Sequence, residues 1–362
     1  KAGARYTAPY VNRLDNMGAD GVQVAADIHN MFRIHNMECD VLAASFKNSQ
    51  QVLNLCKKGV GAVTAAPEVL RALIKHDATF TAEENFENTI ETAIPQTEIY
   101  DMVVDHLTSE LPAGKTEKKA IVIGYDGCRA DALSLVKDKY SGITTLLNDG
   151  ASFNLAYCGG VNYPDGENTQ DTSTAPGWCS VLTGVWAEDN GVYGNGQPKS
   201  LEYKTLMTEL VENGTIDSAS FITKWGGHFS KDDSTYINEK KYCEENGINV
   251  AFNKTSGNEG SMIKAAEELK KADCPDFTIA IYENTDSNGH NLGFSINNPF
   301  YKLGFSHCEN FAYDTIRTIK NRDTFETEDW LIIITSDHGG FGTGHGGPTI
   351  QERMIFVVAN RY

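Results

Sequence analysis

The stretch AIVIGYDG (120–127) is an uninterrupted apolar run that ends in an aspartate and a glycine. Such a run indicates a strand buried on both faces, which is typical of parallel sheets covered by helices. Strand patterns follow at 218–223, 276–284, 329–336 and 353–360. Helical spacing of apolar residues occurs near 130–137, 176–184, 203–213, 260–271 and 308–321. This alternation predicts an α/β fold with a mostly parallel central sheet.

The segment before residue 92 repeats this alternation on a smaller scale. Strand patterns occur at 6–11, 40–45 and 61–66, and helical patterns at 20–35, 49–58 and 67–76. A further helical pattern at 97–111 leads to the polar stretch 112–119, the best candidate for a linker. We therefore predict an N-terminal part (1–92), a helix and linker (93–117) and a main domain (118–362).

Bulk composition narrows the class of protein. The chain has 362 residues, 40% hydrophobic and 22% charged, as in an ordinary globular protein. Its formal net charge of −18 argues against binding to nucleic-acid polymers, which requires a basic surface. It contains no apolar run of the ~18 residues that span a membrane, so we expect no membrane association.

Cysteine spacing bears on the redox compartment. The eight cysteines are scattered and form no C-x-x-C pair, which fits neither a zinc ribbon nor a small disulfide scaffold. We expect reduced thiols and therefore a cytoplasmic location. The first residue is a lysine, so the start of the sequence says nothing about a signal peptide.

Potential metal ligands follow three predicted strands of the main domain. They are Asp126 after the first, Asp286 and His290 in a predicted loop after the second, and Asp337, His338 and His345 in the glycine-rich stretch TSDHGGFGTGHGG (335–347) after the third. The carboxyl ends of parallel neighbours meet at one edge of a sheet. Carboxylates and imidazoles without a thiolate suit zinc or manganese, and two ions roughly 4 Å apart would use all six ligands. The alternative is a plain surface loop with satisfied histidines.

A candidate nucleophile lies in QDTSTAPGWCSVLTG (170–184). Thr174 stands two residues before Pro176, at the predicted start of a helix, where the helix dipole stabilises negative charge. A nearby divalent ion would lower the pKa of the hydroxyl and make it a nucleophile. The alternative is that Thr174 or Ser173 is only an N-cap.

These motifs together resemble the alkaline phosphatase superfamily, and within it the type I phosphodiesterase/nucleotide pyrophosphatase branch. The resemblance covers about 118–362 and rests on Asp126-Gly127 with CRADAL, Thr174-Ala-Pro with LTG, DSNGH, SDHGG and GHGG. It implies an alkaline-phosphatase-like sandwich with two divalent ions, Zn²⁺ foremost and Mn²⁺ or Mg²⁺ as alternatives. It assigns one ion to Asp286, His290 and His345. The other ion falls to Asp126, Asp337 and His338, with Thr174 as ligand and nucleophile.

Four residues near these motifs are candidates for substrate contact. Gly177 stands where we expect diesterase-type members to carry an asparagine that binds a phosphate oxygen. Trp178 replaces the arginine of the sulfatase motif, which argues against a sulfatase and removes an oxyanion clamp expected of a monoesterase. Trp178 could stack on a nucleobase or sugar, or belong to the core. Lys224 and His228 in KWGGH could touch substrate or lie in a plain loop.

The N-terminal segment resembles the last third of a fructose-6-phosphate aldolase/transaldolase barrel. The matching stretches are APYVNRLDNMGADG, VLAASFKNSQQVL and AVTAAPEVLRALIKH. The resemblance implies sugar-phosphate contacts by Arg13, Ser45 and Lys47, but the Schiff-base lysine belongs to an earlier strand that this sequence lacks. Three of eight strands cannot close a barrel, so we expect an incomplete (β/α) barrel segment without aldolase activity. Such a segment would pack on itself or on a partner, for example in a homo-oligomer.

The sequence thus predicts a two-metal hydrolase of small phosphoric esters, of phosphodiester or nucleotide pyrophosphate type, acting through a phospho-threonine. A phosphomonoesterase, a phosphonate hydrolase and a non-catalytic scaffold remain alternatives. Because all proposed ligands lie beyond residue 118, we also expect a shortened chain that begins near Lys115 to fold and keep its metals.

Overall fold

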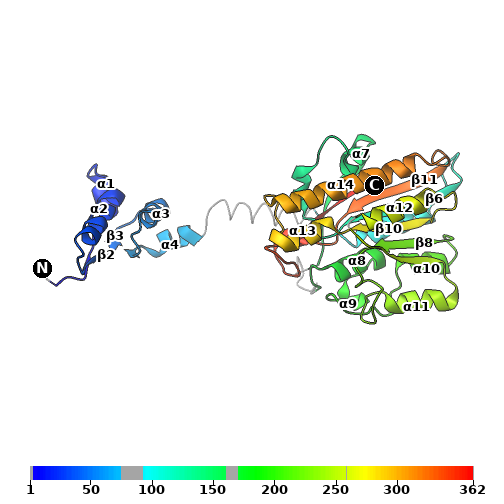
Figure 1. Cartoon of the computed structure of the whole chain (residues 1–362), viewed down its shortest axis with the longest axis horizontal. Helices are drawn as coiled ribbons and strands as arrows, with labels where there is room; N and C mark the ends of the chain where they lie inside the picture. Colours follow the sequence, from blue (N-terminus) through cyan, green and yellow to red (C-terminus); the bar gives the residue numbers. More distant parts are fainter. Residues whose placement is uncertain (1–2, 75–92, 160–169, 258, 362) are drawn as a thin grey trace. The chain divides into compact units, whose positions relative to one another are not determined.

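The computed structural model describes residues 3–74, 93–159, 170–257 and 259–361. The chain divides into two compact units, Lys1–Glu87 and Asn88–Tyr362 (Figure 1). The predicted division at 92 and 117 stays a prediction, because residues 75–92 lie outside the described part.

The larger unit is built on an eight-stranded sheet in the order β5-β7-β12-β11-β6-β10-β8-β9. The strands are β5 (Ile94–Pro95), β6 (Glu117–Tyr125), β7 (Ser152–Tyr157), β8 (Ala219–Thr223), β9 (Val250–Lys254), β10 (Phe277–Tyr282), β11 (Glu328–Thr335) and β12 (Met354–Ala359). Strands β11, β6, β10, β8 and β9 run parallel, whereas β12 is antiparallel to both β11 and β7. The predicted α/β class with a mostly parallel sheet is confirmed.

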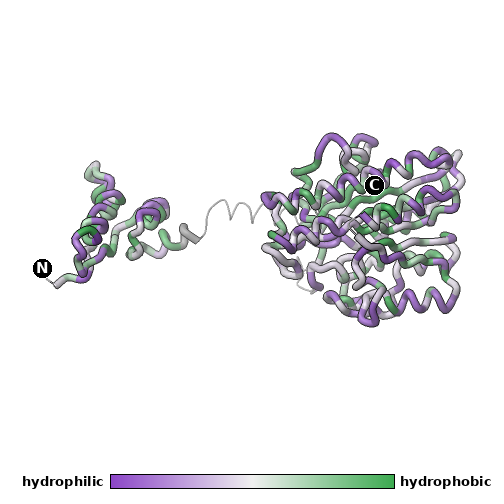
Figure 2. The backbone as a smooth tube through the Cα atoms, in the orientation of Figure 1, coloured by the Kyte–Doolittle hydropathy of each residue, from purple (hydrophilic) through white to green (hydrophobic). Residues whose placement is uncertain are grey.

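Helices cover both faces of this sheet. They are α6 (Glu98–Thr108), η1 (Ala130–Leu135), α7 (Gly142–Asn148), α8 (Thr174–Thr183), α9 (Ala187–Asn190), α10 (Leu206–Glu212), α11 (Ile237–Asn246), α12 (Gly260–Leu269), α13 (Asn284–Leu292), α14 (Pro299–Lys320) and α15 (Ile350–Arg353). The side chains of β6 alternate between two cores: Val122 packs in one with α6, α8 and α10, and Ile121 and Ile123 in the other with α7, α12 and α14. Alternation of this kind follows from the two-residue period of a strand. Hydrophobic residues accordingly concentrate along the central strands (Figure 2).

Two elements of the larger unit differ from the sequence prediction. The stretch after β10 was predicted as a loop, but it forms helix α13, which holds Asp286 and His290 on one face because they are four residues apart. Its Asn and Gly residues are poor helix formers, and α13 packs against α14. The 97–111 pattern forms α6, which belongs to this unit and packs on β6 and α8 rather than standing apart beside a linker.

The smaller unit has strands β1 (Tyr6–Thr7), β2 (Asp40–Val41), β3 (Ala43–Ala44) and β4 (Val63–Thr64) and helices α1 (Val11–Asn16), α2 (Gly21–Ile34), α3 (Ser49–Lys57) and α4 (Pro67–Ile74). The strands pair in parallel as β1-β2 and β3-β4, and a parallel bridge joins Tyr10 to Ala44. Its small core contains Val11, Val41 and Leu55. Among the described residues, no helix of the chain is long and apolar enough to cross a membrane. All eight cysteines are free.

Candidate metal centre

The sheet brings the three predicted groups of ligands to one edge. Strand β6 pairs in parallel with β10 on one side and β11 on the other, with Tyr125 level with Tyr282 and Gly124 level with Thr335. Asp126 follows β6 directly, α13 follows β10, and Asp337 and His338 follow β11. The long register of these strands therefore fixes the starting points of all three ligand-bearing segments.

Asp126, Asp337 and His338 form a buried group whose ligand atoms lie within 4.8 Å of one another. His338 Nε2 is 3.4 Å from Asp337 Oδ2 and 3.7 Å from Asp126 Oδ1. The backbone N–H of Gly127 donates to Asp337 Oδ1 at 3.1 Å, and this bond orients the carboxylate. This group contains the three residues that the sequence assigned to one ion.

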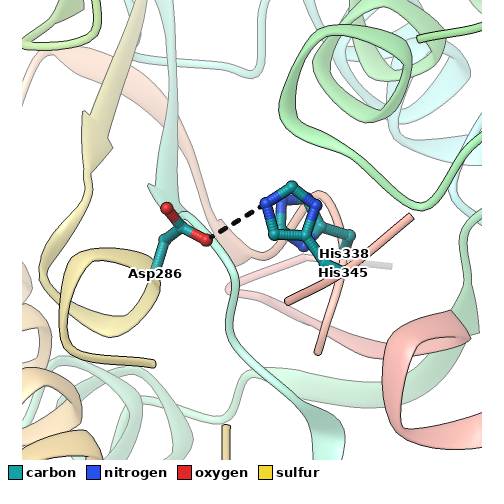
Figure 3. Close-up of side chains that lie close together, drawn as sticks. All are labelled: Asp286, His338 and His345. Atoms are coloured by element: carbon teal, nitrogen blue, oxygen red, sulfur yellow. Dashed lines mark ion pairs between the residues drawn. The ribbon is translucent and has the colours of Figure 1, made fainter. Parts of the chain in front are cut away.

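A second group consists of Asp286, His338 and His345 (Figure 3). His345 Nε2 lies 3.6 Å from Asp286 Oδ1. His290, which the sequence assigned to this ion, approaches the same oxygen to 3.4 Å, but its side chain is 45% exposed. His338 thus stands between the two groups, and His290 is the most exposed of the predicted ligands.

All three histidines turn the same ring nitrogen away from the carboxylates. The Nδ1 atoms of His338, His290 and His345 lie 2.6, 2.9 and 3.2 Å from the backbone carbonyls of Gly339, Thr343 and Thr172. A carbonyl can only accept, so Nδ1 carries a hydrogen, and in the neutral ring Nε2 presents a lone pair toward the carboxylates. Metal-binding histidines are held in this way, with one nitrogen fixed by a carbonyl and the other facing the ion.

The electrostatics of the bare side chains are unfavourable without a cation. Burial and the neighbouring carboxylates raise the pKa of Asp126 well above its usual value, and burial does the same for Asp337. Burial lowers the pKa of His338, and burial together with the charge of His338 lowers that of His345 to about 3. The Asp286 carboxylate, whose Oδ1 lies 3.4 Å from His290 Nε2, raises the pKa of His290 to about 9. A bound divalent cation would reverse the shifts at the aspartates.

Two buried oxygens test whether these residues suit a metal. Asp286 Oδ1 and Asp337 Oδ2 have no hydrogen-bond partner among the described residues. A buried carboxylate oxygen without a donor is costly, and both oxygens face histidine lone pairs. The donor set of carboxylates and imidazoles, with its unpartnered oxygens, therefore fits zinc or manganese.

Thr174 lies at the first turn of α8 and faces the buried group. Its Oγ1 is 3.4 Å from both Asp126 Oδ1 and His338 Nε2. Ser173 is the N-cap residue of this helix, but its side chain makes no capping hydrogen bond. The hydroxyl of Thr174 is thus directed at the candidate metal site rather than used as a cap.

Three of the four candidate substrate contacts are buried and packed against other parts of the protein. Trp178 is completely buried against Gly124, and its Nε1 donates to Asp126 Oδ2 at 3.1 Å, so it orients a ligand instead of stacking on a base. A Cβ at Gly177 would lie 2.6 Å from the carbonyl of Asp337, so this position is needed for close packing. His228 is fully buried among aromatic rings, and burial lowers its pKa to about 3.

Lys224 is the remaining candidate. It follows β8 and lines a cavity of about 490 Å³ that it shares with Asp286 and Trp225. Its role as a substrate contact stays a prediction.

Sequence reasoning missed three residues beside the site. Asn195 lines a cavity of about 110 Å³ together with Thr174 and Asp126, and its Oδ1 accepts the N–H of Ala175 at 2.8 Å. Glu283 lines the same cavity. Gln96 is fully buried and donates from Nε2 to the carbonyl of Asp337 at 3.1 Å. Asn195 and Gln96 lie far from the motifs in sequence, so only tertiary packing reveals them. Glu283 directly follows β10 and could have been found from that position.

Close approach explains two glycines of the 335–347 stretch. A Cβ at Gly339 would lie 2.0 Å from the carbonyl of Gln351, and one at Gly340 would overlap the ring of Phe294. The backbone next to His338 therefore packs too tightly for any larger residue. The surface-loop alternative does not fit this stretch, since Asp337 and His338 are fully buried.

Comparison with known families gives a match for each part of the chain. Residues 120–345 match the type I phosphodiesterase/nucleotide pyrophosphatase family, and residues 1–117 match the transaldolase/fructose-6-phosphate aldolase family. The second match extends past the predicted limit of 92 and includes α6, which packs within the larger unit.

Individual relatives cover only parts of the chain. A "Probable transaldolase" of Symbiobacterium thermophilum is 33% identical over 93 residues, which are 26% of this chain and 43% of the relative. One of Maricaulis maris is 35% identical over 86 residues, 24% of this chain and 40% of the relative. The chain thus spans less than half the length of these curated relatives.

Solved structures with a related arrangement include murine ectonucleotide pyrophosphatase/phosphodiesterase 5, solved as an inactive variant in complex with AMP. It has a TM-score of 0.40 and 17% identity, covering 62% of this chain and 57% of that one. A 2-O GAG sulfatase has a TM-score of 0.46 and 11% identity, covering 68% and 64%.

Proposed function

Since the chain belongs to the type I phosphodiesterase/nucleotide pyrophosphatase family, we propose that it hydrolyses phosphoric esters, with two divalent cations and Thr174 as nucleophile. The observation that carries this proposal is the position of Thr174 Oγ1, 3.4 Å from both Asp126 Oδ1 and His338 Nε2. A hydroxyl held at a helix N-terminus beside a cation site is suited to attack an electrophile.

The residues of the site would have different roles in the reaction. Two divalent cations, Zn²⁺ in the first place, would supply positive charge for the attacking and the leaving oxygen. Asp126, Asp337 and His338 would hold one, and Asp286 and His345, with His290 beside them, the other. Thr174 Oγ would form a bond to phosphorus as the ester oxygen leaves with its electron pair. Water would then release the phosphoryl group from the phospho-threonine and restore the hydroxyl.

Asn195 is suited to bind a phosphate oxygen. Its Oδ1 is engaged by the N–H of Ala175, which fixes the side-chain amide so that its NH₂ group is available to donate into the cavity of Thr174. This amide would serve in place of the asparagine that the sequence lacks at Gly177. At an oxyanion site, removing one preorganised donor of this kind lowers kcat by about 10²–10³-fold.

Hydrolysis assays would test the proposal. The full chain, stripped of metal and then supplied with Zn²⁺, Mn²⁺ or Mg²⁺, would be assayed on aryl phosphodiester, aryl phosphomonoester and aryl phosphonate substrates. We expect metal-dependent turnover with the diester as the preferred substrate. Preference for the monoester or the phosphonate would support the related alternatives, while undiminished activity in excess chelator would reject a metal-dependent mechanism. A non-catalytic scaffold predicts no turnover with any of them.

A further inference from the structure

The charge of the strand ends reverses along one edge of the sheet. Passing from β6 to its successive neighbours β10, β8 and β9, the residues at or just beyond the strand ends are Asp126, Glu283, Lys224 and Lys254. The strands are parallel, and Lys254 is level with Thr223, the residue before Lys224. Acidic residues therefore stand at the metal side of this edge and basic residues at its far side.

Two cavities with shared wall residues lie along this edge. The small cavity of Thr174 and the larger one of about 490 Å³ share Trp225, Glu283 and Asp286 in their walls. The larger cavity is also lined by Lys224, Lys231 and Lys254. A substrate bound at Thr174 can thus extend over Trp225 toward the lysines.

The lysine side of the cavity is built on a fixed turn. Glu283 accepts hydrogen bonds from the hydroxyl of Thr223 at 3.0 Å, from the N–H of Lys224 at 2.9 Å and from the N–H of Trp225. These bonds hold the Glu283 carboxylate against the backbone of the turn. A Cβ placed on Gly226 would lie 3.5 Å from Lys254 Nζ, which shows that this ammonium extends over the turn.

Lys231 and Lys254 add basic charge at this end of the cavity. Within the described part of the chain, neither Lys231 nor Lys254 makes an ion pair, although Asp233 also lines the cavity. The wall of the cavity holds these three lysines and also Asp233, Glu283 and Asp286. Glu283 is hydrogen-bonded to the turn and Asp286 belongs to a candidate metal group, which leaves Asp233 to oppose the lysines. Such a local positive centre attracts anions and is not needed to bind the scissile phosphoryl group, which has the metal site.

From this arrangement we infer that the physiological substrate carries a second anionic group, a carboxylate or a phosphate, which the Lys224–Lys231–Lys254 end of the cavity binds. This inference rests on the proposed function and names its substrate class. Neighbouring strands are about 4.8 Å apart, so the ends of β8 and β9 lie roughly 10–15 Å along the edge from that of β6. The second anion is therefore separated from the scissile phosphorus by a spacer of roughly 10 Å, less the reach of the lysine side chains.

Substrates that differ only in a terminal charge would test this inference. A series of p-nitrophenyl alkyl phosphates with increasing spacer length would be prepared with a terminal methyl, carboxylate or phosphonate group. Turnover would be measured with the full metal-loaded chain. Binding would be measured calorimetrically with the metal-loaded Thr174→Ala variant, which reports on recognition without chemistry. We expect a preference of about tenfold or more for the charged termini at the longer spacers, as for a charge-assisted hydrogen bond, and a smaller preference at high salt.

Paired lysine variants identify the source of the preference. In Lys231→Met/Lys254→Met the charged and uncharged members should be bound and turned over alike, whereas Lys241→Met, which removes an exposed lysine of α11 outside the cavity, should keep the preference. A phosphonate preference above the carboxylate preference would assign the second anion as a phosphate, and the reverse as a carboxylate.

Two outcomes would overturn the inference: equal binding of charged and uncharged members by the Thr174→Ala variant, or a preference that survives in the double lysine variant. Failure of the proposed function has a different signature, because the uncharged diesters would then not be turned over by the unaltered chain at all, while the binding measurement would still decide the lysine site.

Discussion

The two units of the chain both place helices after parallel strands, but their strands differ several-fold in length. In the larger unit β6 has nine residues and β11 has eight, and they pair over the whole length of β11. In the smaller unit β1, β2, β3 and β4 have two residues each. Both units are built from the same kinds of element, so the comparison shows how the length of the strands and the number of strands in a sheet affect the placing of side chains.

Strand length determines whether side chains from distant segments are held together. The long register of β6, β10 and β11 aligns their ends, and ligands that lie more than 200 residues apart in sequence come within 4.8 Å. In the smaller unit Arg13, Ser45 and Lys47 are exposed, and Arg13 lies over the ring of Tyr10. Residues that match a barrel site form one only where the strands of a closed barrel enclose them.

The largest effect should follow from removing the nucleophile of the larger unit. Thr174→Ala removes only the least essential ligand of its ion and keeps Asp126, Asp337 and His338, so we expect turnover to fall by at least roughly 10³-fold with metal content nearly unchanged. Ser173→Ala is the matched control, because Ser173 precedes Thr174 and its side chain makes no capping bond. Diester hydrolysis and elemental analysis of both variants would check this. If Ser173→Ala is the more damaging substitution, the nucleophile has been assigned to the wrong residue.

The two ligand groups should differ in their response to the loss of one histidine. His345 lies within the second group and is mostly buried, whereas His290 lies beside it and is 45% exposed. His345→Ala should therefore strip one of two ions, and His290→Ala should weaken the same site by a smaller factor, about 10–100-fold. Metal titration of the apo forms would measure both affinities. Equal losses in both variants would mean that His290 is a full ligand, as the sequence alone implies.

The sequence predicted the elements of the larger unit that carry strong patterns. Continuous apolar runs are reliable signals of buried parallel strands, and they predicted that all six ligands meet at one edge of the sheet. The assignment of Asp126, Asp337 and His338 to one ion came from the family resemblance. Helix α13 was missed because its Asn and Gly residues suggest a loop, and packing on α14 overrides that local preference. For Trp178 the sequence left open a core position or a substrate contact, and for His228 a substrate contact or a plain loop, because no sequence pattern distinguishes a polar-tipped core residue from a substrate contact.

Replacing Gln96 should have a smaller effect on stability and metal binding, and it tests a residue of one matched region that contacts the other. It lies within the region matched by the transaldolase family, yet its side chain donates to the carbonyl of Asp337. Gln96→Ala leaves a buried carbonyl with one donor fewer, so we expect about 1–3 kcal/mol less stability and roughly tenfold weaker metal binding. Tyr100→Phe is the matched control, because it removes an exposed hydrogen bond to Glu209 from the same segment.

Thermal unfolding and metal titration of both variants would separate these roles. A Gln96→Ala variant that is destabilised but binds metal normally would show that Gln96 supports the fold alone. Tyr100→Phe should change both quantities little, since an exposed bond contributes little to stability.

The smallest effect is expected from removing the smaller unit altogether. The larger unit has its own two cores, and every proposed ligand lies beyond residue 118. The place of the cut matters, because Ile99, Val103 and Leu107 of α6 are buried against β6 and α8. A chain that begins near Lys115, as the sequence first suggested, would lose these side chains and several kcal/mol of apolar burial.

A chain that begins at Asn88 keeps α6 and β5 and should retain metal content and kcat/KM within about twofold, as expected when no ligand or core residue is removed. A chain that begins at Lys115 should be unstable. Circular dichroism would measure the folding of the two shortened chains, and diester hydrolysis their activity. A loss of folding or activity in the Lys115 chain alone would be assigned to α6. Residues 1–362 should not cleave fructose 6-phosphate, because the Schiff-base lysine implied by the resemblance lies outside them. If the Asn88 chain folds and binds metal but loses activity, the smaller unit contributes to the site after all. If the Asn88 chain keeps its activity but is a monomer where the full chain is a homo-oligomer, the smaller unit serves assembly.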